Sequence, residues 1–271
     1  MAHRDAASSE SISVVVAAKN AERTISLCVK SALIGLGKND EVLVFLDGCV
    51  DGTGDIVRAI ADTRLRVFES ESGLGRSEAR NYLIGQASNN LISILDADDV
   101  ALPWRFVVSR KLLRKYDFVF GSAILFGNLP FGLRAAISYP VKLSPALSRH
   151  VLASRNPFIH STASFRKHSL GSDEPYGEFI AEEYVLWVKM ANQGRTFYRS
   201  RIPMSCYKIH PTQISAQENY QSKVEDCAVL RQEKARLRRQ GAIPIRRRTV
   251  GLWIEEELLE LFRRLVRGNR Q

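Results

Sequence analysis

The sequence lacks any long hydrophobic run. No window approaches the ~18 uninterrupted apolar residues that a transmembrane helix requires, and residues 1–10 contain no apolar segment of a secretory signal. We therefore expect a cytoplasmic chain without membrane-spanning helices.

Cysteine is scarce, and its spacing matches no metal site. The four cysteines form no CxxC pair or other zinc-binding spacing, and a disulfide framework is not expected. Cys49 has no histidine partner in the sequence that would make it a nucleophile. The pattern is typical of reduced thiols in a cytosolic protein.

Several signature motifs are also missing. Gly73-Leu74-Gly75 has no third glycine, and the chain has no GKS/T P-loop, no G-x-S-x-G elbow and no H-E-x-x-H zinc motif. These absences argue against a dinucleotide fingerprint, a P-loop nucleotide site, an α/β-hydrolase nucleophile and a metalloprotease.

The chain does contain enough apolar material for a full core. Of its 271 residues, 45% are hydrophobic and 25% are charged, which fits one large α/β domain, alone or with an appendage, and excludes wholesale disorder. The formal net charge is +10, and most of the basic excess lies after residue 220. Such an excess can bind nucleic acid or an anionic membrane surface, or simply form a solvated face.

Apolar runs and helical patterns alternate in the first half of the chain. Continuous apolar segments rich in β-branched residues are typical of parallel strands buried on both faces. Their alternation with helical segments predicts a mostly parallel central sheet flanked by helices. The predicted strands are residues 11–18, 41–46, 64–68 and 91–95, and the predicted helices are residues 19–35, 55–61 and 77–87.

The second half is less regular, and its loops are richer in proline. Gln193-Gly194 is a helix stop signal after a predicted helix at residues 182–192. The other predictions are helices at residues 104–116, 220–240 and 253–266, strands at 118–126 and 158–166, and mostly loops over 127–149.

Polar residues follow three of the predicted strands. Lys19-Asn20, Asp47-Gly48 and the acidic run Asp96 to Asp99 each come directly after an apolar segment. Ligands of parallel sheets bind beyond the carboxyl ends of the strands. We therefore expect these three clusters to meet at one rim and to form a site there.

The acidic run Asp96-Ala97-Asp98-Asp99 is the strongest chemical signal. Three carboxylates within four residues repel one another, and burying them without a counter-ion is costly. Oxygen ligands of this kind suit Mg²⁺ or Mn²⁺, which can hold a pyrophosphate. The alternative is a solvated acidic turn or helix cap, but the position at a strand end favours metal and phosphate chemistry.

Five segments together resemble family 2 of the glycosyltransferases, enzymes with the GT-A nucleotide-sugar fold. The resemblance covers roughly residues 11–215 and rests on the order of the segments. They are VVVAAKNAERTI (Val14–Ile25), FLDGCVDGT (Phe45–Thr53), SGLGRSEARNYLI (Ser72–Ile84), ILDADD (Ile94–Asp99) and AEEYVLWVKMANQG (Ala181–Gly194).

The resemblance implies a GT-A-like α/β fold, with a mostly parallel central sheet flanked by helices and a C-terminal helical extension. It also implies a division of the chain. The parts are a polar arm (1–10), a nucleotide-sugar-binding α/β half (11–120), an acceptor-binding and catalytic half (121–219) and a basic helical extension (220–271).

The resemblance further assigns roles to single residues. On the nucleotide side it implies Asp47 at the base, Ala17, Ala18 and Asn20 around the base and ribose, Arg80 near the base or pyrophosphate, and Asp96 with Ala97 on the ribose side. It implies Asp98 at the metal together with Asp96, Asp99 as support and His210 near the diphosphate and metal. Glu183 aligns with the catalytic base and Glu182 with its acidic neighbour.

The chain also departs from the family pattern. Leu46 stands where the first Asp of the second segment is usual, and Ala18 stands where the opening loop usually has Tyr. These two changes affect the base contacts. Glu183 replaces the usual Asp as base, and Lys189 stands where Arg is common.

Reasoning from the residues alone leaves alternatives open. Glu182 and Glu183 project about 100° apart on a helix, so one can face a cleft as a base, or both can serve the helix N-terminus. Arg76 lies one helical turn before Arg80, and the pair can face a diphosphate or solvent. His210 can bind the metal or the diphosphate, or it can be a packing or surface histidine. His160 can belong to the acceptor side of the site, or it can be a buried, hydrogen-bonded histidine.

The expected function is an inverting, metal-dependent glycosyltransferase of cell-envelope polysaccharide or glycolipid synthesis. The expected partners are Mn²⁺ or Mg²⁺, a nucleoside-diphosphate sugar (UDP-sugar favoured) and a saccharide or lipid-linked saccharide acceptor. A nucleotidyltransferase is the enzymatic alternative, although its basic N-terminal signature is missing. A nucleic-acid-binding module is the other, and we expect no nucleic acid because the basic tail has few aromatic residues to stack on bases.

The last predicted helix, residues 253–266, is amphipathic. Four glutamates crowd its start and arginines its end, and Arg246-Arg247-Arg248 precede it. Such a segment can lie on the inner face of the cytoplasmic membrane, or pack on the catalytic domain or on a second copy in a homodimer. We expect weak, salt-sensitive membrane association through the arginines.

Overall fold

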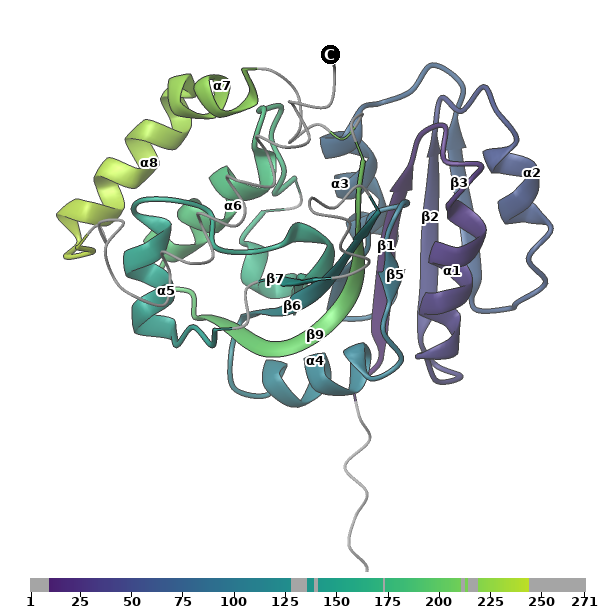
Figure 1. Ribbon diagram of the computed structural model, residues 1–271, viewed down its shortest axis with the longest axis horizontal. Helices are drawn as coiled ribbons and strands as arrows, with labels where there is room; N and C mark the ends of the chain where they lie inside the picture. The colour runs from purple at the N-terminus through teal and green to yellow at the C-terminus, as the bar shows by residue number, and fades with distance from the viewer. Residues whose placement is uncertain are drawn as a thin grey trace, which may run out of the picture.

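The computed structural model describes residues 10–127, 136–138, 141–172, 174–210, 213 and 219–243. Its strands form one mixed sheet in the order β3-β2-β1-β4-β8-β6-β9-β5, with β7 paired to β6. Helices cover both faces of this sheet (Figure 1). The architecture confirms the GT-A-like α/β class predicted from the sequence.

The first half is the parallel part of the sheet. β1 (Ile12–Ala18) pairs in parallel with β2 (Glu41–Asp47) and β4 (Leu91–Ile94), and β2 pairs with β3 (Leu65–Ser70). Successive side chains point to opposite faces, and those of β1, β2 and β4 are buried on both faces, whereas the edge strand β3 is only half-buried. The connecting helices are α1 (Ile25–Ile34), α2 (Thr53–Arg58) and α3 (Arg76–Gln86).

Alternate residues of β1 build two separate cores. Val14 and Val16 pack with residues of α1, whereas Val15 packs with residues of α3 and α6 (Glu182–Asn192). This explains why the strand is apolar throughout rather than alternating.

The second half of the sheet is mixed. β8 (Ser164–Arg166) is antiparallel to β4 and to β6 (Phe118–Gly127), which in turn runs parallel to the long, curved β9 (Phe197–Ile209). The short β5 (Val100–Ala101) and β7 (Ala136–Ser138) pair with β9 and β6. α4 (Arg105–Leu113) follows β5.

Several sequence predictions need correction. The helix expected at 19–35 begins only at Ile25, because Asn20 has φ +49° and ends the strand in a loop. The strand expected at 158–166 is mostly irregular, with a 3₁₀ turn (His160–Thr162) before β8. The region expected to be loops contains β7 and α5 (Pro145–Leu152), which starts with a Ser144 cap. The charged, proline-containing β9 was not predicted.

An aromatic cluster fixes α6 against the sheet. Trp187 is fully buried and meets Phe118 and Phe120 edge-on, at ring-centroid distances of 5.6 and 5.2 Å. Edge-to-face contacts of this kind add to the apolar burial. The acidic residues at the start of α6 are therefore carried by a rigidly packed helix.

The helix predicted at 220–240 is broken into α7 (Tyr220–Asp226) and α8 (Ala228–Arg239), because Cys227 has extended backbone angles. Leu230 and Leu237 of α8 are buried in the core cluster that contains α6. α8 lies along the outer side of α6, at the left of Figure 1. The predicted helix at 253–266 lies outside the described residues. No helix in the described part of the chain is long and apolar enough to cross a membrane.

Candidate active site

A cavity of about 1220 Å³ lies between the two halves of the molecule. The carboxyl ends of β1, β2 and β4 line one side, as the sequence predicted, and α6, α7 and α8 line the other. All the predicted site residues line it: Ala17, Ala18, Asn20, Asp47, Arg76, Arg80, Asp96, Ala97, Asp98, Glu182, Glu183 and His210.

Asn20 and Asp47 hold the loops at the donor side of the cavity. The Asn20 side-chain oxygen accepts a hydrogen bond from the backbone N–H of Val50 at 2.9 Å. Asp47 is nearly buried, and its Oδ1 accepts hydrogen bonds from the N–H groups of Leu74 and Gly75, which begin the turn into α3. Both side chains fix the loops that line this side of the cavity by binding their backbone N–H groups. Ala17 and Ala18 line the same side with small side chains.

Arg80 lines the cavity and contacts one carboxylate from each half of the molecule. Its Nη2 lies 3.0 Å from Asp96 Oδ1, and its Nη1 donates to Glu182 Oε1 at 2.7 Å. Arg76, one turn earlier on α3, lies 3.4 Å from the other Glu182 oxygen. Glu182 is 2% exposed, so water cannot solvate its charge. The two arginines compensate that charge within the protein.

His160 and Tyr176 complete this network. The His160 ring lies 3.7 Å from Asp96 Oδ1 through Nδ1 and 2.9 Å from the Tyr176 hydroxyl through Nε2. Burial raises the pKa of Asp96, but the His160 hydrogen bond and the Arg80 charge outweigh it and hold the pKa below its usual range. Burial and Arg80 lower the pKa of His160. Asp96 is therefore a fixed carboxylate beside a neutral ring.

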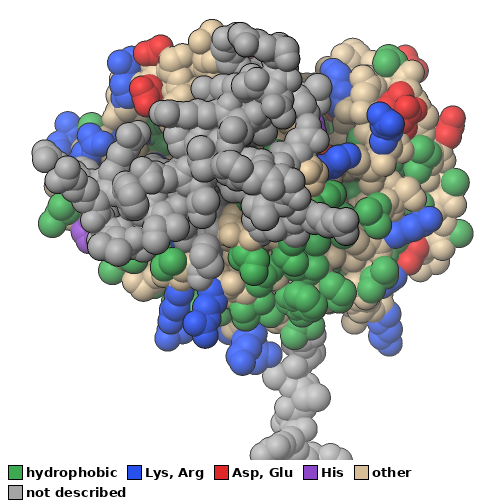
Figure 2. All heavy atoms as spheres, in the orientation of Figure 1, with side chains coloured by type: hydrophobic (Ala, Val, Ile, Leu, Met, Phe, Trp, Pro, Cys, Tyr) green, Lys and Arg blue, Asp and Glu red, His purple; other side chains and the backbone are tan. Residues whose placement is uncertain are grey.

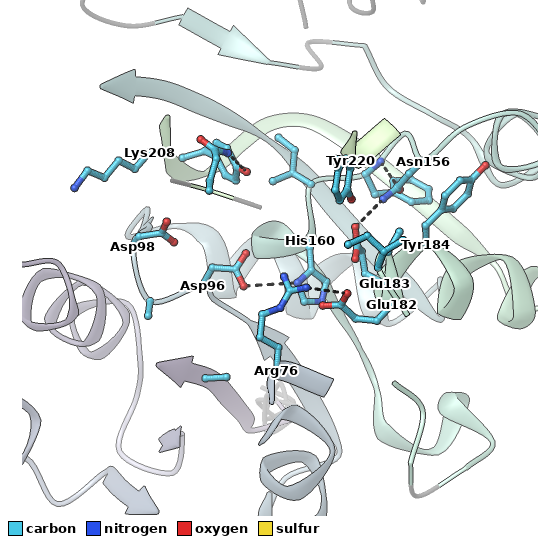
Figure 3. A pocket seen from close by; sticks show the side chains of 18 of the residues that line it. Arg76, Asp96, Asp98, Asn156, His160, Glu182, Glu183, Tyr184, Lys208 and Tyr220 are labelled. Atoms are coloured by element: carbon cyan, nitrogen blue, oxygen red, sulfur yellow. Dashed lines mark hydrogen bonds and ion pairs between the residues drawn. The ribbon is translucent and has the colours of Figure 1, made fainter. Parts of the chain in front are cut away.

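Glu183 has a different environment from Glu182. Its only hydrogen bond to a described side chain comes from Asn156 Nδ2, at 3.5 Å from Glu183 Oε1. Figure 3 shows Glu183 facing Asn156, while Glu182 faces the arginines. Burial, and then the charge of Glu182, raise the pKa of Glu183 to about 7. A carboxylate with such a pKa can accept a proton at neutral pH.

Asp98 and His210 form the second polar group of the cavity. His210 Nε2 and Asp98 Oδ2 are 2.8 Å apart, and both side chains are partly exposed. Asp99 is turned away: it is 1% exposed, and its Oδ1 accepts a hydrogen bond from the Lys208 N–H at 3.0 Å. Burial and the two neighbouring carboxylates raise the pKa of Asp99.

The Asp98 carboxylate and the His210 imidazole supply part of the ligand set that a divalent cation needs. One carboxylate and one imidazole, both reaching the cavity, suit Mn²⁺ or Mg²⁺ if a diphosphate and water supply the other ligands. The described residues contain no group of three or more His, Cys, Asp or Glu that would hold a metal alone. Asp96 is already paired with Arg80, so Asp98 and His210 are the better ligands.

Sequence reasoning missed several lining residues that the tertiary structure brings in. Asn156 comes from an irregular segment that carries no motif. Arg155, Arg231 and Lys234 also line the cavity, and the last two come from a region considered only for membrane or nucleic-acid contact.

The profile of glycosyl transferase family 2 matches residues 13–171. The chain belongs to glycosyl transferase family 2. It is 25% identical over 214 residues to the UDP-Glc:alpha-D-GlcNAc-diphosphoundecaprenol beta-1,3-glucosyltransferase WfaP of Escherichia coli, covering 76% of this chain and 80% of that one. It is 33% identical over 198 residues to the succinoglycan biosynthesis protein ExoO of Rhizobium meliloti, covering 72% of this chain and 56% of ExoO.

Solved structures share the fold of this family 2 glycosyltransferase. S. aureus TarS 1–349, in complex with UDP-GlcNAc, matches with a TM-score of 0.66 at 16% identity, covering 93% of this chain and 71% of that one. The mannosyltransferase PcManGT of Pyrobaculum calidifontis, in complex with GDP-Man and Mn²⁺, matches with a TM-score of 0.60 at 18% identity, covering 95% and 73%.

Proposed function

We propose that this enzyme is an inverting, metal-dependent glycosyltransferase that moves a sugar from a nucleoside-diphosphate sugar, with UDP favoured, to an acceptor hydroxyl. The names of WfaP and ExoO support a role in cell-envelope polysaccharide or glycolipid synthesis, with a saccharide or lipid-linked saccharide as acceptor. Residues 11–120 would bind the donor, residues 121–219 would hold the acceptor and the base, and residues 220–271 would form the extension.

The environment of Glu183 carries this proposal. An acceptor hydroxyl must lose its proton as it attacks the anomeric carbon, and Glu183 is a carboxylate in the cavity that has no arginine partner among the described residues. Its pKa of about 7 makes it a better base than an ordinary glutamate. Glu182 fits a positioning role, because its two oxygens are bound by Arg76 and Arg80.

The donor would lie across the ends of β1, β2 and β4, with its base near Asn20 and Asp47 and its ribose near Asp96. Asp98 and His210 would hold the cation, which supplies charge neutralisation at the leaving diphosphate when bound. Attack from the Glu183 side, opposite the diphosphate, would invert the anomeric centre.

The alternatives have less support. A nucleotidyltransferase would use the same acids, but the family match argues against it. On the face shown in Figure 2, Lys and Arg side chains lie at several separate places among acidic and apolar ones rather than in one stripe. The described surface on this side therefore does not favour nucleic acid.

A transfer assay with purified variants tests the proposal. Glu183→Gln should keep nucleotide-sugar binding but lower the transfer rate by ~10²–10⁴-fold, because an amide cannot accept the proton. Glu178→Gln removes an exposed carboxylate outside the cavity and is the matched control. If Glu183→Gln keeps full transfer activity, Glu183 is not the base.

A further inference from the structure

Basic side chains gather at one end of the cavity, beyond Glu183. Arg155 follows α5, and Arg231 and Lys234 lie on α8; all three line the cavity. The opposite end, where the donor diphosphate is proposed to bind, carries Asp96 and Asp98 as well as Arg76 and Lys208. The end beyond Glu183 therefore adds a second group of cations to the cavity lining.

The basic cluster lies close to the proposed base. Arg155 precedes Asn156, whose amide is 3.5 Å from Glu183. The Lys234 ammonium lies 5.4 Å from the centre of the Tyr184 ring, and Tyr184 follows Glu183 in α6. In Figure 3, Asn156, Tyr184 and Tyr220 lie on one side of Glu183 and Asp98 on the other.

The fold satisfies Lys234 and Arg231 only in part. Lys234 donates to the Ser154 carbonyl at 2.8 Å, and Arg231 to the Asp226 carbonyl at 3.2 Å. Neither forms an ion pair within the described part of the chain. The exposed Glu225 is the acidic residue that α7 adds to this part of the lining. Burial and the Arg238 charge lower the pKa of Lys234, and the charge of Glu225 offsets this lowering only in part.

We propose that Arg155, Arg231 and Lys234 form an anion subsite that binds a phosphate or diphosphate group of the acceptor. This inference rests on the proposed function, because it takes Glu183 as the residue that meets the acceptor hydroxyl. Since the cluster lies beside the neighbours of Glu183, the phosphate would be within about one or two sugars of the reacting hydroxyl. The substrate class is a short glycosyl phosphate or diphosphate, rather than a long neutral glycan.

Calorimetric titration of inorganic pyrophosphate into protein saturated with UDP tests the subsite. UDP binding is measured first and alone, so failure of the proposed donor site is seen separately. We expect pyrophosphate to bind the UDP-saturated protein at a one-to-one ratio without displacing UDP. Arg231→Gln should weaken this binding about tenfold or more, because a charge-assisted hydrogen bond is lost.

Arg239→Gln is the matched control, since it removes the same charge from the exposed side of the same helix. It should leave pyrophosphate binding unchanged. The inference is overturned if pyrophosphate binds only by displacing UDP, or if both variants weaken binding equally. It is also overturned if Arg231→Gln reduces sedimentation with phosphatidylglycerol vesicles but not pyrophosphate binding, because the cation then serves a membrane surface.

Discussion

Glu182 and Glu183 are adjacent in sequence and chemically identical, yet the fold places them in opposite environments. Glu182 is held by Arg80 at 2.7 Å and by Arg76 at 3.4 Å. Glu183 has a weak contact to Asn156 and the negative charge of its neighbour beside it. In the first arrangement both carboxylate oxygens are bound by arginines, and in the second burial and a neighbouring charge oppose ionisation. With its pKa raised to about 7, Glu183 exchanges a proton near neutral pH.

The raised pKa of Glu183 predicts the pH dependence of transfer. The base acts only when ionised, so the rate should rise with pH and level off above about 7. Initial rates between pH 5 and 9 at saturating donor would measure this. An acidic limb near pH 4.5 would mean that the base is an ordinary, solvated carboxylate.

The same pKa makes a prediction about stability. Because the folded state favours the protonated form, the stability contributed by Glu183 is present below its unfolded value near 4.5 and is lost as the pH rises to about 7. As the pH rises between these two values, the free energy of unfolding of Glu183→Gln should therefore increase relative to that of the wild type. Urea unfolding at pH 5 and pH 8 measures the difference, and a constant difference would contradict the raised pKa.

Asp98 is the residue on which the proposed metal binding depends. Asp98→Asn should remove the Mn²⁺-dependent part of the thermal stabilisation by UDP and leave the fold intact, because the side chain is partly exposed at a strand end. Asp55→Asn, an exposed change on α2 outside the cavity, is the control. Undiminished Mn²⁺-dependent stabilisation in Asp98→Asn would remove Asp98 from the metal site.

At the scale of elements, Arg80 connects α3 to α6 and to the end of β4. It is buried with two carboxylates, Asp96 and Glu182, from opposite halves of the molecule. Its guanidinium can bind both at once because its donors are arranged in a planar fork. The resemblance implied Arg80 near the base or pyrophosphate, and that stays a prediction; the structure adds that Arg80 lines the cavity and contacts both Asp96 and Glu182.

Breaking this link should destabilise the protein strongly. Arg80→Met removes the 2.7 Å partner of the buried Glu182 and the 3.0 Å partner of the partly exposed Asp96, and we expect a loss of ~3 kcal/mol in the free energy of unfolding. The double variant Arg80→Met/Glu182→Met should recover part of that loss, because one of the unpaired charges is also removed. Urea unfolding of both variants and of Glu182→Met completes a double-mutant cycle. A coupling energy near zero would contradict the link.

At the scale of the whole molecule, the described part of the C-terminal extension packs on the rest of the fold. α8 is part of the catalytic unit, because Leu230 and Leu237 are buried in the core that contains α6, and Lys234 lines the cavity. The basic character of residues 220–240 is thus partly directed at the cavity. The predicted helix at residues 253–266 lies outside the described residues, and its binding to a membrane surface stays a prediction.

Vesicle sedimentation tests that role. The full chain should bind phosphatidylglycerol vesicles at low salt more strongly than a chain ending at Gln240, because each basic residue near an anionic surface adds ~1 kcal/mol. The difference should vanish at high salt. Equal sedimentation of the two chains at low salt would exclude the segment after Gln240 from membrane binding.

The sequence by itself determined the parallel half of the fold and the location of the site. Its strands are continuous apolar runs with helices between them, and local patterns of this kind decide which segments become buried strands. The polar clusters after β1, β2 and β4 had to meet, because the carboxyl ends of parallel strands share one edge of the sheet.

Only the tertiary structure decided what each polar residue does there. β9 escaped prediction because its charged side chains and Pro203 carry no strand period, although pairing with β6 makes it a strand. Asn156 and Lys234 reach the cavity through packing between segments far apart in the chain. The proposed choice of Glu183 over Glu182, which the family resemblance implied, is supported by the contact of Glu182 with Arg80 and Arg76, and no local pattern in the sequence encodes that contact.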